Sequence, residues 1–138
     1  SSKELIKRLA KKKVKLNITA IFTIDQVKTA LSALDNNVPS IISVFCGRIA
    51  DTGKDPIPLM IDCLNELKIN SKSELLWASP RELINIIQAD KIGCHIITVS
   101  KDIIKKLQFF NYNLEDYSLD TVKAFYKDAV DANFKIKN

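Results

Sequence analysis

Apolar, β-rich runs alternate with amphipathic helical segments along the chain, and this alternation constrains the fold more than any other feature. The β-rich runs cover residues 14–22, 38–45, 75–78 and 95–99, and each is followed by apolar residues at helical spacing. Strands separated by helices of about ten residues favour parallel pairing with right-handed crossovers. The sequence therefore predicts an α/β protein with a parallel sheet, in the order α, then βα four times, then a closing helix.

Short polar signals mark the expected helix starts. Three pairs have the spacing of a capping box, in which each side chain satisfies a free amide: Ser1 with Glu4, Thr23 with Gln26, and Ser79 with Glu82. Asp55 precedes Pro56, and proline suits the first position of a helix because the amide there needs no partner. The closing amphipathic helix is expected to begin near Ser118.

The length limits the architecture. At 138 residues the chain fits one domain, which we expect to span residues 1–138, whereas a complete β/α barrel runs to about 250 residues. Four βα units suit a flavodoxin-like sheet or half of a barrel, and the order of the elements does not decide between them.

The composition argues against several classes of protein. The formal net charge is +5, and much of it lies near Lys11–Lys13, but no aromatic residues or nucleic-acid motif accompany this run. We therefore favour a solvated helix face over a nucleic-acid site. No apolar run approaches the roughly 18 residues of a membrane span, and the first residues lack the apolar stretch of a signal peptide. We expect a cytoplasmic protein with neither a nucleic-acid nor a membrane partner.

The three cysteines, Cys46, Cys63 and Cys94, lie far apart in apolar runs. Their odd number and wide spacing favour reduced thiols, and they lack the spacing of metal ligands. The sequence predicts no metal site.

Polar residues interrupt the first two strands. Because a strand alternates its faces, Asn17 and Thr19 are expected on one face of the first strand, and Ser43 and Phe45 on one face of the second. In a barrel or an open parallel sheet, the loops at the carboxyl ends of the strands build the site. The structural alternative is that Asn17 and Thr19 only satisfy each other inside a barrel.

Two arginines follow strands by a few residues. Arg48 and Arg81 converging on one mouth would suit a phosphate, which guanidinium groups bind bidentately. The helix start at Ser79 would add free amides. The structural alternatives are a serine that is only a helix cap and two ordinary surface arginines. The single histidine, His95, lies at the start of its strand, remote from the expected site, which favours a structural role.

Four segments in order resemble the transaldolase family, from its fourth helix to its end. N-I-T-A-I-F-T at 17–23 is similar to the family's fifth strand, and S-V-F-C-G-R at 43–48 resembles its sixth-strand signature. D-T-G-K-D at 51–55 matches the loop that follows, and W-A-S-P-R at 77–81 resembles the seventh strand. The tail at 118–136 is similar to the family's closing helix.

The resemblance implies a TIM-type barrel, of which this chain would hold strands 5–8 with their helices and a C-terminal helix. It implies transfer of a dihydroxyacetone unit between sugar phosphates through a lysine Schiff base, in pentose phosphate metabolism, with no cofactor. The implied site residues are Asn17 and Thr19 in catalysis and Ser43, Phe45, Arg48, Ser79 and Arg81 in substrate binding. Asn17 would lie near the Schiff base, and Thr19 would hold a proton-relaying water. Ser43 would bind a substrate hydroxyl, and Phe45, a tyrosine in the related fructose 6-phosphate aldolases, favours transfer.

The sequence departs from the family's motifs at Val44, Cys46 and Pro80. The family's Schiff-base lysine belongs to sequence upstream of Ser1, so the segment alone is expected to be inactive. The expected partners are a sugar phosphate, the missing N-terminal half of the barrel and other copies in a homo-oligomer. The alternatives are a noncatalytic sugar-phosphate-binding or regulatory half-barrel and a fructose 6-phosphate aldolase.

Overall fold

The computed structural model describes residues 2–68 and 72–132, and its contacts divide the chain into two compact units, Ser1–Ile104 and Lys105–Asn138. The elements of the first unit are α1 (Ser2–Lys11), β1 (Leu16–Ile21), α2 (Ile24–Leu31), β2 (Ser40–Val44), α3 (Cys46–Ala50), α4 (Ile57–Leu67), β3 (Ser73–Trp77), α5 (Ile84–Lys91) and β4 (Ile96–Ile97). The helix α6 (Lys101–Lys105) belongs to the first unit except for its last residue. The second unit holds the 3-10 helix η1 (Lys106–Phe109) and α7 (Leu114–Asp131). The expectation of one domain over residues 1–138 stays a prediction.

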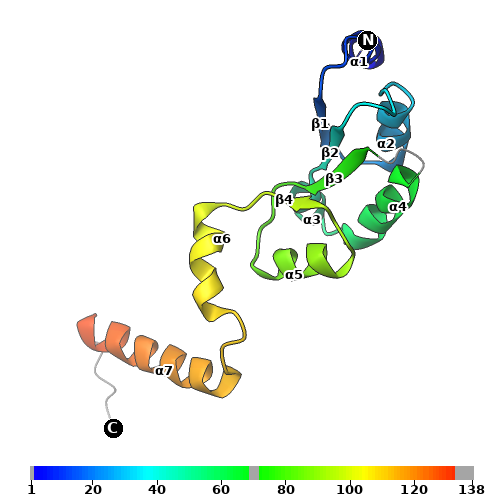
Figure 1. Cartoon of the computed structure of the whole chain (residues 1–138). Coiled ribbons are helices and arrows are strands. Elements are labelled where there is room, and N and C mark those ends of the chain that lie inside the picture. The colour runs from blue at the N-terminus through cyan, green and yellow to red at the C-terminus, as the bar shows by residue number, and fades with distance from the viewer. Residues whose placement is uncertain (1, 69–71, 133–138) are drawn as a thin grey trace. The chain divides into compact units, whose positions relative to one another are not determined.

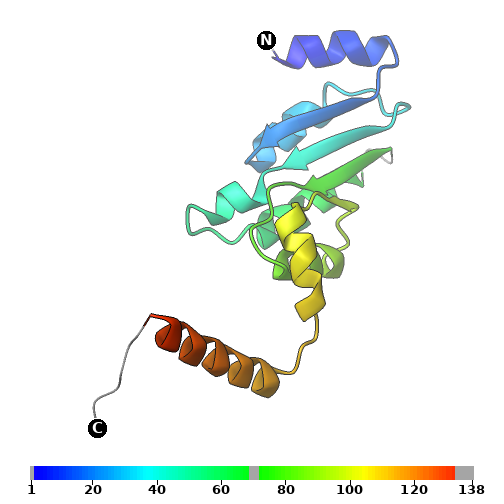
Figure 2. The same cartoon turned by 90° about the vertical axis from the view of Figure 1, so that its left-hand side faces the viewer.

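All strand pairs of the sheet are parallel, and the strand order is β1-β2-β3-β4. Figures 1 and 2 show β1, β2 and β3 side by side. The predicted parallel α/β sheet is therefore confirmed. Strands that follow one another in space as they do in sequence lack the switch in strand order of a flavodoxin-like sheet. The sheet fits a partial barrel of TIM type.

One face of the sheet carries the core. Ile42 and Leu75 are partners in the β2–β3 register, and both are fully buried in the cluster that the helices cover. Val44 and Trp77, the next pair on the same face, are buried there too. Val27 of α2 and Met60 and Cys63 of α4 supply the helical side of the cluster. At about 25 cal/mol per Å² of buried apolar surface, this layer is what fixes the sheet to its helices.

Local capping positions α2 as the sequence predicts. The Thr23 hydroxyl accepts a hydrogen bond from the Gln26 amide at 3.3 Å, and the Gln26 side-chain oxygen accepts from the Thr23 amide at 3.1 Å. The capping box is confirmed. Asp55 accepts a hydrogen bond from the Ile57 amide at 2.9 Å, but the N-cap of α4 is Pro56, so the helix begins one residue later than the sequence predicts.

Two predicted helix starts are wrong. Ser79 does not cap a helix, because α5 begins at Ile84 and the side-chain oxygen of Asn85 accepts from the amides of Arg81 and Glu82 instead. The closing helix α7 begins at Leu114 rather than near Ser118, because Asn113 provides the cap. The proposed cap at Ser1 lies outside the described residues.

His95 has the structural role that its position indicates. Its Nδ1 atom accepts a hydrogen bond from the Leu75 amide at 3.0 Å, so the imidazole satisfies a β3 amide beside β4, where the strand is only two residues long. A neutral imidazole with its proton on Nε2 is required for this bond.

The second unit is organised by aromatic contacts. The rings of Phe109, Tyr112 and Tyr117 lie 5.4–6.3 Å apart, and the Tyr112 hydroxyl donates to Asp120 at 2.9 Å. These contacts join η1 to the first turns of α7. Across residues 2–68 and 72–132, no helix is both long enough and apolar enough to cross a bilayer.

A close backbone approach joins the loops that follow β2 and β3. A Cβ atom on Gly47 would overlap the Ser79 carbonyl oxygen and would lie 3.2 Å from Arg81 Nε. The Gly47 amide also faces the Ala78 carbonyl oxygen at 3.4 Å. Since the obstructing atoms are backbone, only glycine lets these two loops meet.

We expect Gly47→Ala to lower the free energy of unfolding by about 2 kcal/mol, because the added methyl group forces the two loops apart. Urea unfolding followed by circular dichroism measures the change. Gly53→Asn is the comparison variant: nothing lies within 4 Å of its Cβ position, so its loss of stability reports only the strain of a side chain at a φ of +79°, which is smallest for asparagine. Equal unfolding midpoints for Gly47→Ala and the wild type would contradict the close approach.

Two hydroxyls pair inside the sheet at the start of β2 and β3. Ser40 and Ser73 are register partners, both are buried, and their oxygens lie 2.9 Å apart. Because both residues are buried, we expect each hydroxyl to depend on the other for its hydrogen bond.

Removing one of these hydroxyls leaves the other without its hydrogen-bond partner. We expect Ser40→Ala to cost about 1–2 kcal/mol of unfolding free energy, and the double variant Ser40→Ala with Ser73→Ala to cost less than the sum of the two single changes. A double-mutant cycle by urea unfolding measures this coupling. Strict additivity would show that the two hydroxyls do not depend on each other.

Candidate functional site

The candidate site lies at the carboxyl ends of β1, β2 and β3, where the chain enters the following loops and α3 (Figure 1). Phe45 follows β2 directly, and its amide donates to the carbonyl of Ile21, the last residue of β1, at 2.9 Å. The Ala78 amide donates in turn to Val44 at 2.8 Å. The ends of the three strands are therefore tied together, and we call this edge of the sheet the rim.

The strand register places Asn17 and Ser43 on one face of the sheet. Asn17 pairs with Ile41, and Ser43 lies two residues further along β2, so alternation gives both the face opposite the helix-covered core. Asn17 is exposed and lies early in β1, whereas Ser43 is buried near the end of β2. Asn17 thus lies closer to the amino ends of the strands than the rim does. Trp77 of β3 belongs to the core face.

A bulge changes the direction of the β1 side chains near Thr19. The register shifts between Ile18 and Ile21, and Ala20 has a φ of +58°. The extra residue leaves Thr19 and Ala20 both exposed and returns Ile21 to the core. A non-glycine residue at positive φ is sparsely populated, and such residues cluster at functional sites.

Aromatic side chains cover the ends of β1 and β2. The rings of Phe22 and Phe45 lie 5.8 Å apart, and the Arg48 guanidinium lies over the Phe45 ring at 5.9 Å. An arginine over an aromatic face is attracted by the negative charge of that face. Phe45 therefore forms part of the apolar surface of the rim and contacts the Arg48 guanidinium.

Arg81 forms a two-point ion pair with Asp51. Its Nε donates to Asp51 Oδ1 at 3.1 Å and one Nη donates to Asp51 Oδ2 at 2.6 Å. These bonds lower the pKa of the Asp51 carboxyl and raise the pKa of Arg81, and the nearby charge of Arg48 lowers the Asp51 pKa further. Because the Asp51 pKa is lowered, the pair is formed at neutral pH and is lost only as the pH falls through that lowered value.

Ser79 lies between the two arginine-bearing loops in an unusual conformation. Its φ is +58°, and its carbonyl oxygen faces Gly47. The side chain is half-buried at the rim. Ser79 is therefore placed by the close loop approach rather than by a helix cap.

The predicted catalytic residues Asn17 and Thr19 line two different cavities. Asn17 lines a 260 Å³ cavity with Lys15 and Glu74, toward the amino ends of the strands. Thr19 lines a separate cavity of 380 Å³ between β1, α1 and α2. The structure thus brings Arg48 and Arg81 to one rim and leaves Asn17 and Thr19 opening onto other spaces.

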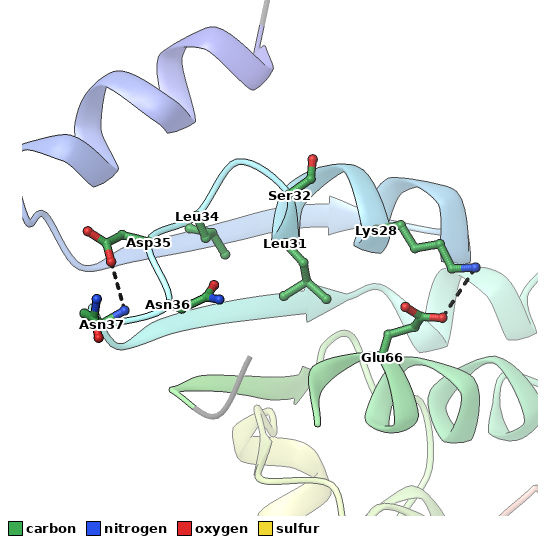
Figure 3. A pocket seen from close by; sticks show the side chains of 8 residues that line it. All are labelled: Lys28, Leu31, Ser32, Leu34, Asp35, Asn36, Asn37 and Glu66. Carbon is green, nitrogen blue, oxygen red and sulfur yellow. Dashed lines mark hydrogen bonds and ion pairs between the residues drawn. The ribbon is translucent and has the colours of Figure 1, made fainter. Parts of the chain in front are cut away.

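A larger cavity of 620 Å³ lies at the amino end of β2, between α2 and α4 (Figure 3). Its polar lining includes the ion pair of Lys28 with Glu66, 3.4 Å long, and the turn in which Asp35 accepts from the Asn37 amide. In β/α folds the amino ends of the strands serve stability rather than chemistry. We therefore assign the site to the rim and not to this cavity.

The cysteines are core residues without reactive character. Cys46 and Cys63 are buried, and no disulfide joins the three thiols. Burial raises the pKa of all three, that of Cys63 to about 12, so each is protonated at neutral pH.

Sequence reasoning missed three residues of the rim. Phe22 supports Phe45, Asp51 holds Arg81, and Asn85 accepts from the Arg81 amide at 2.8 Å. The signal for Phe22 was its place directly after the strand. Asp51 carried a signal too, three residues after Arg48 in a matching motif, although its partner is thirty positions away.

Comparisons with known proteins agree with these motifs. The family model for transaldolase/fructose-6-phosphate aldolase matches residues 1–136. A probable transaldolase of Methanococcus maripaludis is 32% identical over 113 residues, which cover 81% of this chain and 50% of the relative. Probable transaldolases of Thermoanaerobacter sp. and Clostridioides difficile are 31% and 30% identical, over 88% and 95% of this chain and 54% and 57% of their own lengths. The chain thus spans about half the length of the curated relatives it matches. It belongs to the transaldolase/fructose-6-phosphate aldolase family.

Proposed function

We propose that this chain is the phosphate-binding half of a transaldolase, a cytoplasmic enzyme of sugar-phosphate metabolism that transfers a dihydroxyacetone unit through a lysine Schiff base. The observation that carries the proposal is the rim, where Arg48 lies on α3 and Asp51, the residue that ends α3, binds Arg81. Two guanidinium groups on one mouth fit a phosphate, and both belong to segments that resemble the family's motifs.

The two unpaired edges of the described sheet support the proposal of a half-barrel. β1 pairs with β2 alone and β4 with β3 alone among the described strands, whereas each strand of a closed barrel has two neighbours. We propose that an N-terminal half supplies four further strands, which pair with β1 and β4. Closure would cover the face that carries Asn17 and Ser43.

Each rim residue has a role in this proposal. Arg48, Ser79 and Arg81 hold the sugar phosphate, while Ser43 binds a hydroxyl of the dihydroxyacetone unit. The Schiff-base lysine comes from the other half: its neutral amine attacks the ketone, and the resulting iminium accepts the electron pair of the broken carbon–carbon bond. Asn17 lies near that iminium and Thr19 holds the water that relays protons.

Phe45 favours group transfer over simple aldol cleavage. The side chain has no hydroxyl, and it packs against Phe22 beneath Arg48, so this wall of the pocket is apolar. An apolar wall offers no proton donor to the dihydroxyacetone intermediate, which then persists until an acceptor aldehyde arrives.

A fructose 6-phosphate aldolase and a noncatalytic sugar-phosphate-binding half-barrel are the alternatives. We further propose a homo-oligomer, with neither a nucleic-acid nor a membrane partner.

Reduction of a Schiff base tests the reaction. Treating the complete protein with borohydride and fructose 6-phosphate should add the mass of a reduced dihydroxyacetone unit to one lysine, as measured by intact-protein mass spectrometry. Omitting the sugar phosphate is the control. If sugar-phosphate binding is retained but no adduct forms, the noncatalytic alternative is correct.

Removal of either arginine tests the phosphate site. We expect Arg48→Ala and Arg81→Ala each to raise KM for fructose 6-phosphate by about tenfold or more, because each removes charged hydrogen bonds to the phosphate. The KM for unphosphorylated fructose should not change. Arg8→Ala, which removes an exposed arginine of α1, is the matched control. Equal effects on both sugars would mean that the arginines do not bind the phosphate.

A further inference from the structure

Asp51 contacts the edge of the Arg81 guanidinium that is formed by Nε and one Nη. The two bonds measure 3.1 Å and 2.6 Å, and both side chains are half exposed. A guanidinium has five N–H donors in a planar fork, and two of them are used here. Three donors remain, and two of them, one on each Nη atom, form the outer edge and can bind another bidentate anion.

The surroundings fix this arrangement on both sides. Asp51 ends α3, where its amide donates to the Gly47 carbonyl oxygen at 2.9 Å. The Arg81 amide is held by Asn85 at 2.8 Å. The guanidinium passes Gly47 so closely that a Cβ atom there would lie 3.2 Å from Nε. The carboxylate and the backbone of Arg81 therefore come from two different loops that are each anchored.

We propose that Asp51 is a positioning residue, which binds the inner edge of Arg81 and thereby presents the outer edge to the phosphate of the substrate. This inference rests on the proposed function. Asp51 does not touch the substrate; it acts through Arg81. Arg48, which is supported by the Phe45 ring, supplies the second cation without a carboxylate partner among the described residues.

The competing interpretation makes the opposite prediction. If Asp51 merely occupied the place of the phosphate or repelled it, removing its charge would strengthen phosphate binding. If Asp51 orients Arg81, removing its charge weakens binding, because a long flexible side chain must then be ordered when the substrate arrives. The sign of the effect separates the two.

The experiment uses Asp51→Asn in the complete protein, because asparagine keeps the shape and places an N–H donor where Arg81 needs an acceptor. We expect KM for fructose 6-phosphate to rise about fivefold with kcat within about twofold of wild type, and KM for fructose to stay unchanged. In an Arg81→Ala background, Asp51→Asn should have no further effect. Asp62→Asn on α4, outside the rim, is the matched control.

A lower KM for fructose 6-phosphate in Asp51→Asn would overturn the inference, and so would additive effects of Asp51→Asn and Arg81→Ala.

A readout that needs no turnover separates this inference from the proposed function. In NMR spectra of the Arg81 Nε–H group, inorganic phosphate should shift the resonance in the wild type, and Asp51→Asn should weaken that binding. If no Schiff base forms but this shift and its weakening occur, the catalytic proposal fails and the role of Asp51 stands. If phosphate leaves the Arg81 resonance unchanged, the role of Asp51 is wrong.

Discussion

The burial of one apolar face of the sheet is the constraint from which the rest of the molecule follows. Ile42, Leu75, Val44 and Trp77 pack in register against α2 and α4, and a shift of one residue in any strand would turn these side chains toward water. The cost of such a shift fixes the parity of every strand. Because the parity is fixed, Ser43 lies on the other face, although no contact of Ser43 itself requires it.

Backbone conformation at the rim departs from this regular pattern at two positions. Ala20 at the bulge of β1 and Ser79 after β3 both have a φ of +58°. A non-glycine residue in this region costs about 1–3 kcal/mol and persists only where the surroundings impose it. For Ser79 the surrounding constraint is visible, since its carbonyl oxygen occupies the space that a side chain on Gly47 would need. Both unusual residues lie in segments that resemble the family's motifs.

The two rim arginines are stabilised in different ways, and the difference has consequences for binding. Arg48 rests on an apolar ring, so its full charge and its donors remain available to an anion. Arg81 is partly compensated by Asp51, which costs attraction but restricts its orientation. Arg48 therefore contributes an uncompensated positive charge, and Arg81 contributes a guanidinium with a restricted orientation. Together with Asp51 they carry a net charge of about +1, so the local electric field favours an anion.

Local signals in the sequence determined the parallel α/β pattern, the capping box at Thr23 and the family, because each depends on residues close together in the chain. The same local reasoning failed at Ser79, whose spacing to Glu82 fits a capping box. In the structure the Ser79 carbonyl oxygen lies against Gly47, and the Asn85 side chain accepts hydrogen bonds from the amides of Arg81 and Glu82. Local reasoning also missed the pairing of Asp51 with Arg81, since no periodicity links the two positions. Only the tertiary structure decided these points, because they are set by the approach of two loops at the end of the sheet, and that approach depends on packing among segments distant in sequence.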